Sequence, residues 1–238
     1  MRKLLMAGLL SAALVATAAP AAFAHHRPGS PLVKPGHRVQ GDTPGQWLGR
    51  WWTTVLTTSS PEDHFPGCAP LGRRVVGVFV PPWGGEATCT VRKGSQLMLV
   101  PDTTSCSDWE QPPFRGDTPA ERRACARLIL EGAGVPEVTI DGRLFQLGDA
   151  YRAVAPDQRA TLPDDNFLEA PAGTRIRFGG DGWVAFTKPL ARGRHELVLH
   201  ATGTFDGEPY DVTGVFHVDV VYRPHAHRSV QPRTTTLR

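Results

Sequence analysis

The chain has 238 residues, of which 40% are hydrophobic and 21% are charged, a globular composition that excludes wholesale disorder. It contains 26 Lys and Arg against 23 Asp and Glu, a formal net charge of +3. Two of the positive charges, Arg2 and Lys3, stand at the start of the chain; without them the balance is 24 against 23, which is not that of a nucleic-acid-binding protein. The 25 glycines and 22 prolines are too many for a helical bundle and favour a fold with many turns.

Residues 1–24 have the pattern of a secretory signal peptide. Two basic residues are followed by an apolar stretch over residues 4–15 and by the small-x-small cleavage signal Ala22-Phe23-Ala24. We therefore expect a secreted, extracellular protein whose mature chain begins at His25. The apolar stretch is too short for an anchor, and no later segment approaches the roughly 20 apolar residues of a membrane span.

Four cysteines follow this segment, namely Cys68, Cys89, Cys106 and Cys125. An even number of cysteines in an exported chain predicts two disulfides. Of the three possible pairings we favour Cys68–Cys89 with Cys106–Cys125, because each pair then closes a loop of about 20 residues and stabilises the fold by roughly 3 kcal/mol. A zinc site is disfavoured because the sequence has no C-x-x-C spacing.

Residues 25–41 are rich in Pro, Gly and His, and we expect a flexible arm there.

Two helices are predicted. The first helix is expected near residues 43–58, capped by Asp42 or Thr43 with Pro44 in its first turn. Its apolar residues recur at i, i+3 and i+4 and form one stripe: Trp47, Leu48, Trp51, Trp52, Val55 and Leu56.

The second helix is expected near residues 118–131. Thr118-Pro119-Ala120-Glu121 has the form of a capping box, and glycines at 132 and 134 end the helix. Its inner face is predicted to consist of Ala124, Cys125, Leu128 and Ile129.

Residues 224–238 are rich in His, Arg and Thr without any acid, and we interpret them as a disordered tail.

Most of the remaining chain is predicted to form short strands. Pro82-Trp83-Gly84-Gly85 and Asp141-Gly142 are typical of hairpin turns. Because strands and helices do not alternate, we predict a mainly β fold, an Ig-like or jelly-roll-like β-sandwich with two packed helices, in a single domain over residues 42–223. The strands are expected at residues 75–80, 87–91, 96–100, 137–140, 174–178, 183–187, 194–204 and 210–222.

The register of the last strand pair can be predicted as well. If Asp206-Gly207 is a two-residue turn, one register places apolar residues on one face and polar residues on the other. The opposed pairs are then Leu197 with Phe216 and His195 with Val218 on the apolar face, and Glu196 with His217 on the polar face.

Five segments carry a resemblance to known proteins: residues 47–52, Gly77-Val78-Phe79-Val80, Ala87-Thr88-Cys89-Thr90-Val91, residues 161–166 and residues 190–199. Together they resemble a large family of uncharacterised secreted bacterial proteins, commonest in actinobacteria. The closing hairpin is also similar to the final strand pair of bacterial Ig-like modules. The resemblance covers most of the mature chain and implies the fold and the compartment, but none of its motifs is catalytic.

The new amino terminus is one candidate for chemistry. The α-amine and imidazole of His25 are able to bind copper, as in the histidine brace of lytic polysaccharide monooxygenases, with His37, His64 or His200 as a further ligand. The simpler interpretation is a terminal arm that happens to begin with His, because residues 25–41 show no pattern that would hold them against a sheet. We therefore predict no cofactor and keep copper at His25 as a minor alternative.

Acidic and histidine side chains offer two further candidates. Carboxylates near residue 165 are candidates for a glycosidase pair or calcium ligands, although an Asp-rich turn explains most of them. His and acidic residues that share the polar face of the last hairpin are explained equally well by ion pairs. The carboxylates are Asp164, Asp165, Glu169 and Asp181, and the hairpin group is Glu196, His200, His217 and Asp219.

Two tryptophans lie where periodicity does not bury them. Trp83 stands in the Pro-Trp-Gly-Gly turn and Trp109 in a long loop, and exposed Trp rings can stack on sugars. The sequence has no Gly-x-Ser-x-Gly nucleophile motif. We therefore expect a non-catalytic extracellular binding or structural module, with a glycan or cell-wall polymer as the possible partner bound by Trp83 and Trp109. The alternative is a secreted enzyme, either a carbohydrate-active hydrolase or a copper oxidase.

Overall fold

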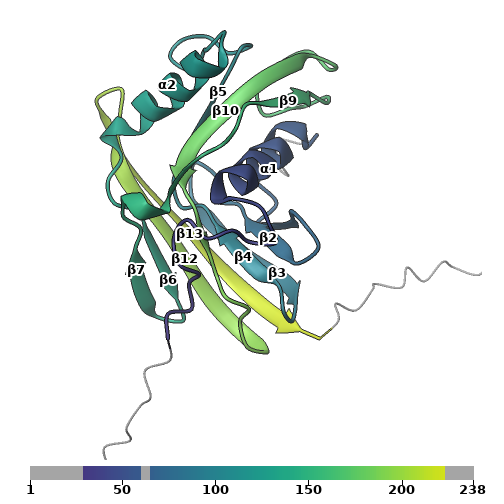
Figure 1. Ribbon diagram of the computed structural model, residues 1–238, viewed down its shortest axis with the longest axis vertical. Helices are drawn as coiled ribbons and strands as arrows, with labels where there is room; N and C mark the ends of the chain where they lie inside the picture. Colours follow the sequence, from purple (N-terminus) through teal and green to yellow (C-terminus); the bar gives the residue numbers. More distant parts are fainter. Residues whose placement is uncertain (1–28, 60–64, 223–238) are drawn as a thin grey trace, which may run out of the picture.

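The computed structural model describes residues 29–59 and 65–222 (Figure 1). The predicted signal peptide, the tail, His25 and His64 lie outside the described residues. No helix in the described ranges is long and apolar enough to cross a membrane.

The described chain is mainly β, with sheets packed on each other and two α-helices, as predicted. The helices are α1 (Pro44–Thr57) and α2 (Pro119–Ile129), followed by the short 3-10 turns η1 (Leu130–Gly132) and η2 (Asp149–Tyr151). The strands are β1 (Cys68–Pro70), β2 (Val75–Val78), β3 (Gly85–Arg92), β4 (Gln96–Leu99), β5 (Thr103–Ser107), β6 (Glu137–Ile140), β7 (Arg143–Gln146), β8 (Arg152–Val154), β9 (Gln158–Thr161), β10 (Arg175–Trp183), β11 (Ala185–Phe186), β12 (Gly193–Phe205) and β13 (Glu208–Val221).

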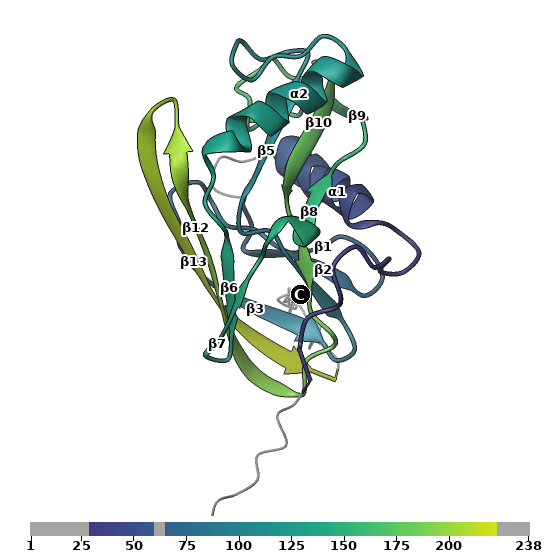
Figure 2. The same ribbon diagram turned by 60° about the vertical axis from the view of Figure 1, so that its left-hand side comes forward.

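The strands form three sheets. A five-stranded sheet has the order β3-β13-β12-β6-β7, a second sheet has the order β1-β2-β4-β11, and a third has the order β5-β10-β8 with β9 also paired to β10. The long β12–β13 hairpin forms one side of the molecule. Helix α2 crosses the top of the molecule in Figure 2, beside β5 and β10. Only Val184 separates β10 from β11, so the chain passes directly from the third sheet into the second.

The predicted register of the last hairpin is confirmed. Asp206 and Gly207 have φ angles of 51° and 82°, as a tight two-residue turn requires. Leu197 pairs with Phe216 and Glu196 pairs with His217, as predicted. The same register continues along the whole length of the two strands. The hairpin therefore has one buried and one exposed face.

The hairpin predicted at residues 82–85 is wrong. β2 pairs with β1 and β4, whereas β3 runs parallel to β13 in the five-stranded sheet. The turn instead carries the chain from one sheet to the other. Gly84, with φ of 75°, lies against the backbone of Thr213 so closely that a Cβ would stand 2.6 Å from the Thr213 carbonyl oxygen. Gly84 thus allows the turn to lie against the backbone of β13.

Helix α1 begins and packs as its sequence predicts. Thr43 and Gln46 form a reciprocal capping box, and the whole predicted apolar stripe is buried. The helix lies over β8, β9 and β10, and a Cβ at Gly45 would collide with the Val154 carbonyl. This close approach anchors the helix on the third sheet.

Helix α2 is capped by Thr118 and Glu121 as expected, but its predicted inner face is right only for Cys125 and Ile129, which are half-buried. Ala124 is exposed and the Leu128 side chain is 63% exposed. The buried positions are Arg122 and Ala126. The apolar periodicity of the sequence does not predict that Arg122 is buried, because the groups that compensate its charge approach it only in the folded chain.

Arg122 has no solvent exposure and is held by three oxygen acceptors. Its Nε donates to Asp157 Oδ1 over 2.7 Å, and its Nη1 donates to the carbonyls of Gly116 and Asp117 over 2.8 and 3.0 Å. These bonds connect α2 to the loop before it and to the segment between β8 and β9. A buried guanidinium with such partners is a structural element of the fold.

Two apolar cores fill the sandwich. The first surrounds the tryptophans of α1 and includes Phe79, Phe178 and Phe186. The second core lies between the five-stranded sheet and the second sheet, β1-β2-β4-β11, and includes Leu97 and Leu197. Both cores exclude water from the strand faces that the alternating pattern predicts to be buried.

Both predicted disulfides are confirmed. Cys68–Cys89 joins β1 to β3, and therefore two different sheets, with its Cα atoms 5.8 Å apart. Cys106–Cys125 joins β5 to α2 with its Cα atoms 6.2 Å apart. The described chain has no free cysteine.

The prediction of a flexible arm is wrong for residues 29–41, the part of the arm that the structure describes. Leu32 and Val39 are buried, and the Val33 N–H donates to the Phe186 carbonyl over 2.8 Å. The Val39 carbonyl accepts the indole N–H of Trp47 over 2.9 Å. Isolated apolar residues between prolines therefore dock the segment without any periodic pattern.

Candidate functional site

A cleft of about 630 Å³ lies between the outer half of the β12–β13 hairpin and the α1 side of the molecule. One wall is formed by Ala201 and Phe205 of β12 and by Tyr210 and Val212 of β13. The facing wall comes from α1, from the segment that follows β9 and from the loop that follows β5. The cleft is therefore built by segments far apart in the sequence.

The hairpin tip is held in place by two contacts beyond η1. The Gly134 N–H donates to the Thr202 carbonyl over 2.7 Å, and Ala133 forms a β-bridge with Gly203. The Phe205 ring lies 5.5 Å from the Phe114 ring, centroid to centroid. These contacts fix the hairpin wall of the cleft.

The facing wall is a connected set of aromatic rings. Ring centroids are 5.2 Å apart for Trp51 and Trp52, 6.5 Å for Trp52 and Phe167, and 5.7 Å for Phe167 and Phe65. Trp52 Nε1 donates to Thr103 Oγ1 over 3.0 Å, and Trp51 Nε1 donates to the Val78 carbonyl over 3.0 Å. With both indole N–H groups bound, the rings present a fixed apolar surface.

Asp102 and Tyr210 form a hydrogen-bonded pair in the cleft. The Tyr210 hydroxyl donates to Asp102 Oδ2 over 2.8 Å. Burial raises the pKa of Asp102, and hydrogen bonds from Tyr210 and the Thr103 backbone together with the charge of Arg152 oppose this rise. Burial and the neighbouring Asp102 charge raise the pKa of Tyr210. The pair links the hairpin to the strand region before β5.

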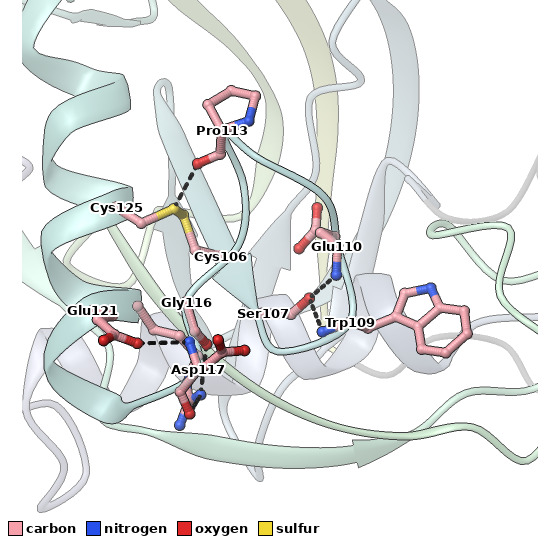
Figure 3. The surroundings of a disulfide bond; sticks show 10 residues. Cys106, Ser107, Trp109, Glu110, Pro113, Gly116, Asp117, Glu121 and Cys125 are labelled. Atoms are coloured by element: carbon pink, nitrogen blue, oxygen red, sulfur yellow. Dashed lines mark hydrogen bonds between the residues drawn. A yellow bond between two sulfur atoms is a disulfide. The ribbon is translucent and has the colours of Figure 1, made fainter.

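Glu110 is, like Asp102, a half-buried carboxyl group of the cleft. Burial raises its pKa to about 7, although hydrogen bonding to Ser107 acts in the opposite direction. The Ser107 Oγ accepts the backbone N–H groups of Trp109 and Glu110 over 3.3 and 3.2 Å, which shapes the turn. Glu110 Oε2 is buried and has no hydrogen-bond partner among the described residues. Figure 3 shows Glu110 and Trp109 leaving this loop in different directions, near the Cys106–Cys125 disulfide.

Within residues 29–59 and 65–222, the charged residues that line the cleft are all acidic: Asp102, Glu110 and Glu169. No Lys, Arg or His lines it in the described part of the chain. Arg152 acts on Asp102 electrostatically but is itself paired with Asp181 through bonds of 2.9 and 3.2 Å. The cleft is thus apolar and aromatic with a negative bias.

The two predicted tryptophan sites are exposed but separate. Trp83 is 76% exposed, and its ring meets Phe65 edge-on at 6.2 Å beside the cleft. Trp109 is 42% exposed and lines a neighbouring hollow with Pro112 and Pro113. No ring contact joins Trp83 to Trp109 in the described ranges.

The four predicted carboxylates do not converge. Asp181 is buried against Arg152, whereas Asp164 and Asp165 are exposed in a turn. Asn166 organises that turn by donating to the carbonyls of Pro163 and Ala170 over 2.8 and 2.7 Å. Only Glu169 lines the cleft, at an exposed position.

The histidines of the five-stranded sheet form separate pairs with acids. His217 bonds Glu86 over 2.8 Å rather than the opposed Glu196, and His200 bonds Asp211 over 3.0 Å with Glu137 3.6 Å from its other ring nitrogen. Across residues 29–59 and 65–222, no group of three or more His, Cys, Asp or Glu is placed to hold a metal ion. These pairs, like Asp219 on the same face, belong to the solvated surface of the sheet.

His195 is half-buried and hydrogen-bonded, as the predicted register requires. Its Nδ1 lies 2.7 Å from Asp141 Oδ2 and its Nε2 lies 3.0 Å from the Ala191 carbonyl. Burial lowers its pKa, but the bonds to Asp141 and Ala191 outweigh burial and leave the pKa raised. His195 thus ties the hairpin to the β6–β7 turn.

Comparisons with known proteins leave the family open. No family model matches the chain, and no curated protein matches it. Its resemblance to secreted bacterial proteins stays a prediction.

Three solved structures are weakly similar. The cysteine protease inhibitor EhICP2 from Entamoeba histolytica is 13% identical over 57% of this chain and 87% of its own, with a TM-score of 0.20. PbICP-C, solved in complex with falcipain-2, is 10% identical over 62% and 99%, with a TM-score of 0.24. Amebosin is 15% identical over 59% and 99%, with a TM-score of 0.19. Likenesses at this level support no conclusion about function.

Proposed function

We propose that the protein is a secreted, non-catalytic binding module whose cleft takes one small, mainly apolar molecule. The observation that carries this proposal is the cleft of about 630 Å³ with its wall of fixed aromatic rings. Ligand pockets of proteins typically measure about 300–1,000 Å³ and are lined mainly by apolar side chains. The two disulfides support an oxidising compartment, in agreement with the predicted signal peptide.

A binding role is favoured over nucleophilic catalysis by the polar groups of the cleft. Thr103 and Ser105 supply hydroxyl groups, but no histidine lines the described cleft to activate them. The Thr103 hydroxyl already donates to the Asp181 carbonyl over 2.8 Å. The polar groups therefore orient a ligand rather than attack it.

The neutral fluorescent probe N-phenyl-1-naphthylamine tests this proposal. With 17 non-hydrogen atoms at roughly −0.3 kcal/mol each, binding of about −5 kcal/mol corresponds to a Kd on the order of 100 µM. Val212→Trp places a large ring in the cleft and should weaken binding about ten-fold or more. Val154→Trp, at a 48% exposed position outside the cleft, is the matched control.

A saturable fluorescence increase that Val212→Trp abolishes and Val154→Trp preserves supports the proposal. Far-ultraviolet circular dichroism verifies that both variants are folded. Absence of saturation, or equal affinity in Val212→Trp, would refute the cleft as the binding site.

A glycan or cell-wall polymer is a second candidate ligand, favoured by the 76% exposure of Trp83. Such a ring can stack on a sugar outside the cleft, with modest affinity. Trp83→Ala combined with Trp109→Ala should then abolish retention on insoluble cell-wall material while the cleft still binds the naphthyl probe. Unchanged retention would exclude this second candidate.

A further inference from the structure

We propose that the ligand of the cleft carries a positively charged nitrogen that lies near Glu110. This inference rests on the proposed function and names the chemical class of its ligand, an apolar or aromatic amine.

The first argument is the charge of the lining. Asp102, Glu110 and Glu169 bring carboxyl groups to the cleft, and no cationic side chain among the described residues lines it. Among the described lining residues, an anionic ligand would meet only like charge. A cation gains from every one of these groups.

The second argument is the state of Glu110 itself. Its Oε2 atom is buried without a hydrogen-bond partner in the described chain. Ser107 interacts with the carboxyl group, but a buried carboxylate oxygen without a partner of its own is costly, and a nearby positive charge reduces that cost. Burial raises the pKa of Glu110 to about 7, so the group ionises readily near neutral pH when a cation approaches.

Asp102 is less suited to this role because its interactions are already occupied. Its Oδ2 accepts the Tyr210 hydroxyl, and the Arg152 charge acts on it. Glu169 is exposed to water, which screens its charge. Glu110 is therefore the carboxyl group that a bound cation would compensate most.

The third argument is the aromatic character of the walls. Phe114 lines the cleft together with Glu110, and Trp52, Phe167 and Tyr210 also contribute to the lining. Aromatic faces attract ammonium groups, most strongly where water is excluded. Aromatic rings combined with an acidic group are typical of sites that bind organic cations.

The test compares two ligands with the same apolar body. At pH 8, 1-naphthylmethylamine carries an ammonium group and 1-naphthylmethanol is neutral. Both are measured by displacement of N-phenyl-1-naphthylamine from the full mature chain. We expect the amine to bind about ten-fold more tightly, the size of one charge-assisted hydrogen bond.

Glu110→Gln should remove this preference and leave the affinity for the alcohol within about three-fold. Glu196→Gln, the matched control at an exposed carboxyl group outside the cleft, should retain it. Equal affinities of the two ligands for the unaltered protein, or a preference that survives Glu110→Gln, would overturn the inference while the proposed function stands. If the neutral probe itself does not bind, the proposed function fails and the inference fails with it.

A measurement on the unaltered protein covers the case in which Glu110→Gln does not fold. Between pH 8 and pH 5 the amine stays protonated, whereas Glu110, whose pKa is raised to about 7, takes up a proton; burial raises the pKa of Asp102 as well. Tyr210 stays neutral across this range because its pKa is raised, Arg152 is paired with Asp181, and Glu169 is exposed to water. The preference for the amine should therefore shrink at pH 5, and an undiminished preference would refute the role of Glu110.

Discussion

Replacing Glu110 with Gln should stabilise the protein at pH 8 and leave its stability nearly unchanged at pH 4.5. Burial raises the pKa of Glu110 from 4.5 in the unfolded chain to about 7 in the folded chain. The folded state thus holds the proton more tightly than the unfolded state. The contribution of Glu110 to stability is greatest below about pH 4.5 and is lost as the pH rises to about 7.

The pKa difference of about 2.5 units corresponds to about 3 kcal/mol, which glutamine avoids because it does not ionise. For a domain of this size, 3 kcal/mol raises Tm by about 6–12 °C. Urea unfolding followed by tryptophan fluorescence at pH 4.5 and pH 8 measures the difference between variant and unaltered protein. In that difference, titrations of other groups such as Asp102 and His195 cancel.

Glu169→Gln is the control, because its exposed carboxyl group should shift stability by less than about 0.5 kcal/mol at either pH. A stability difference for Glu110→Gln that is the same at pH 4.5 and pH 8 would refute the reasoning. The carboxyl group would then be hydrated or paired in the folded protein.

Three further changes test the architecture. Arg122→Met removes one partner of the Arg122–Asp157 ion pair and should lower the free energy of unfolding, measured in urea, by about 3 kcal/mol. Arg123→Met, on the exposed face of α2, should lower it little, and equal effects of the two changes would contradict the burial of Arg122. Replacing Cys106 and Cys125 together with Ser should cost roughly 3 kcal/mol, and alkylation followed by intact-mass measurement should find no reactive thiol in the unaltered protein. Thr118→Ala should cost about 1 kcal/mol and Thr118→Ser much less, and a thermal midpoint unaffected by the alanine would argue against the capping box.

Local patterns predicted the local features of this fold. The apolar stripe of α1 is buried throughout, and both capping boxes form as expected. The Asp206-Gly207 turn also determines the hairpin register, because the two faces of a strand pair cannot exchange without exposing apolar residues. Cysteine spacing gave both disulfides for a similar reason, since short loops close most easily.

Features that depend on distant segments escaped prediction. The parallel pairing of β3 with β13 joins residues far apart in the sequence, and nothing near Trp83 signals it. The buried face of α2 contains Arg122 because Asp157, on a different segment, compensates its charge.

The cleft escaped for the same reason. Asp102 and Glu110 look like ordinary loop residues until the fold places both in the lining of the cleft. The one signal in the sequence is the position of Glu110 in an aromatic, proline-rich loop beside Cys106. Such a signal indicates burial only after the fold is known.

The interior position of β13 also sets an order for the assembly of the five-stranded sheet. β3 pairs with β13 alone in that sheet, and β13 extends to Val221. Cys89 lies on β3 opposite Val218, so the strand that carries it has no permanent neighbour in this sheet until more than a hundred later residues have been synthesised. During that interval the thiol of Cys89 depends on the nearby segment around Cys68 for its position. Oxidation of this pair before the sheet closes would give an early tether that shortens the search of β3 for its place beside the last strand.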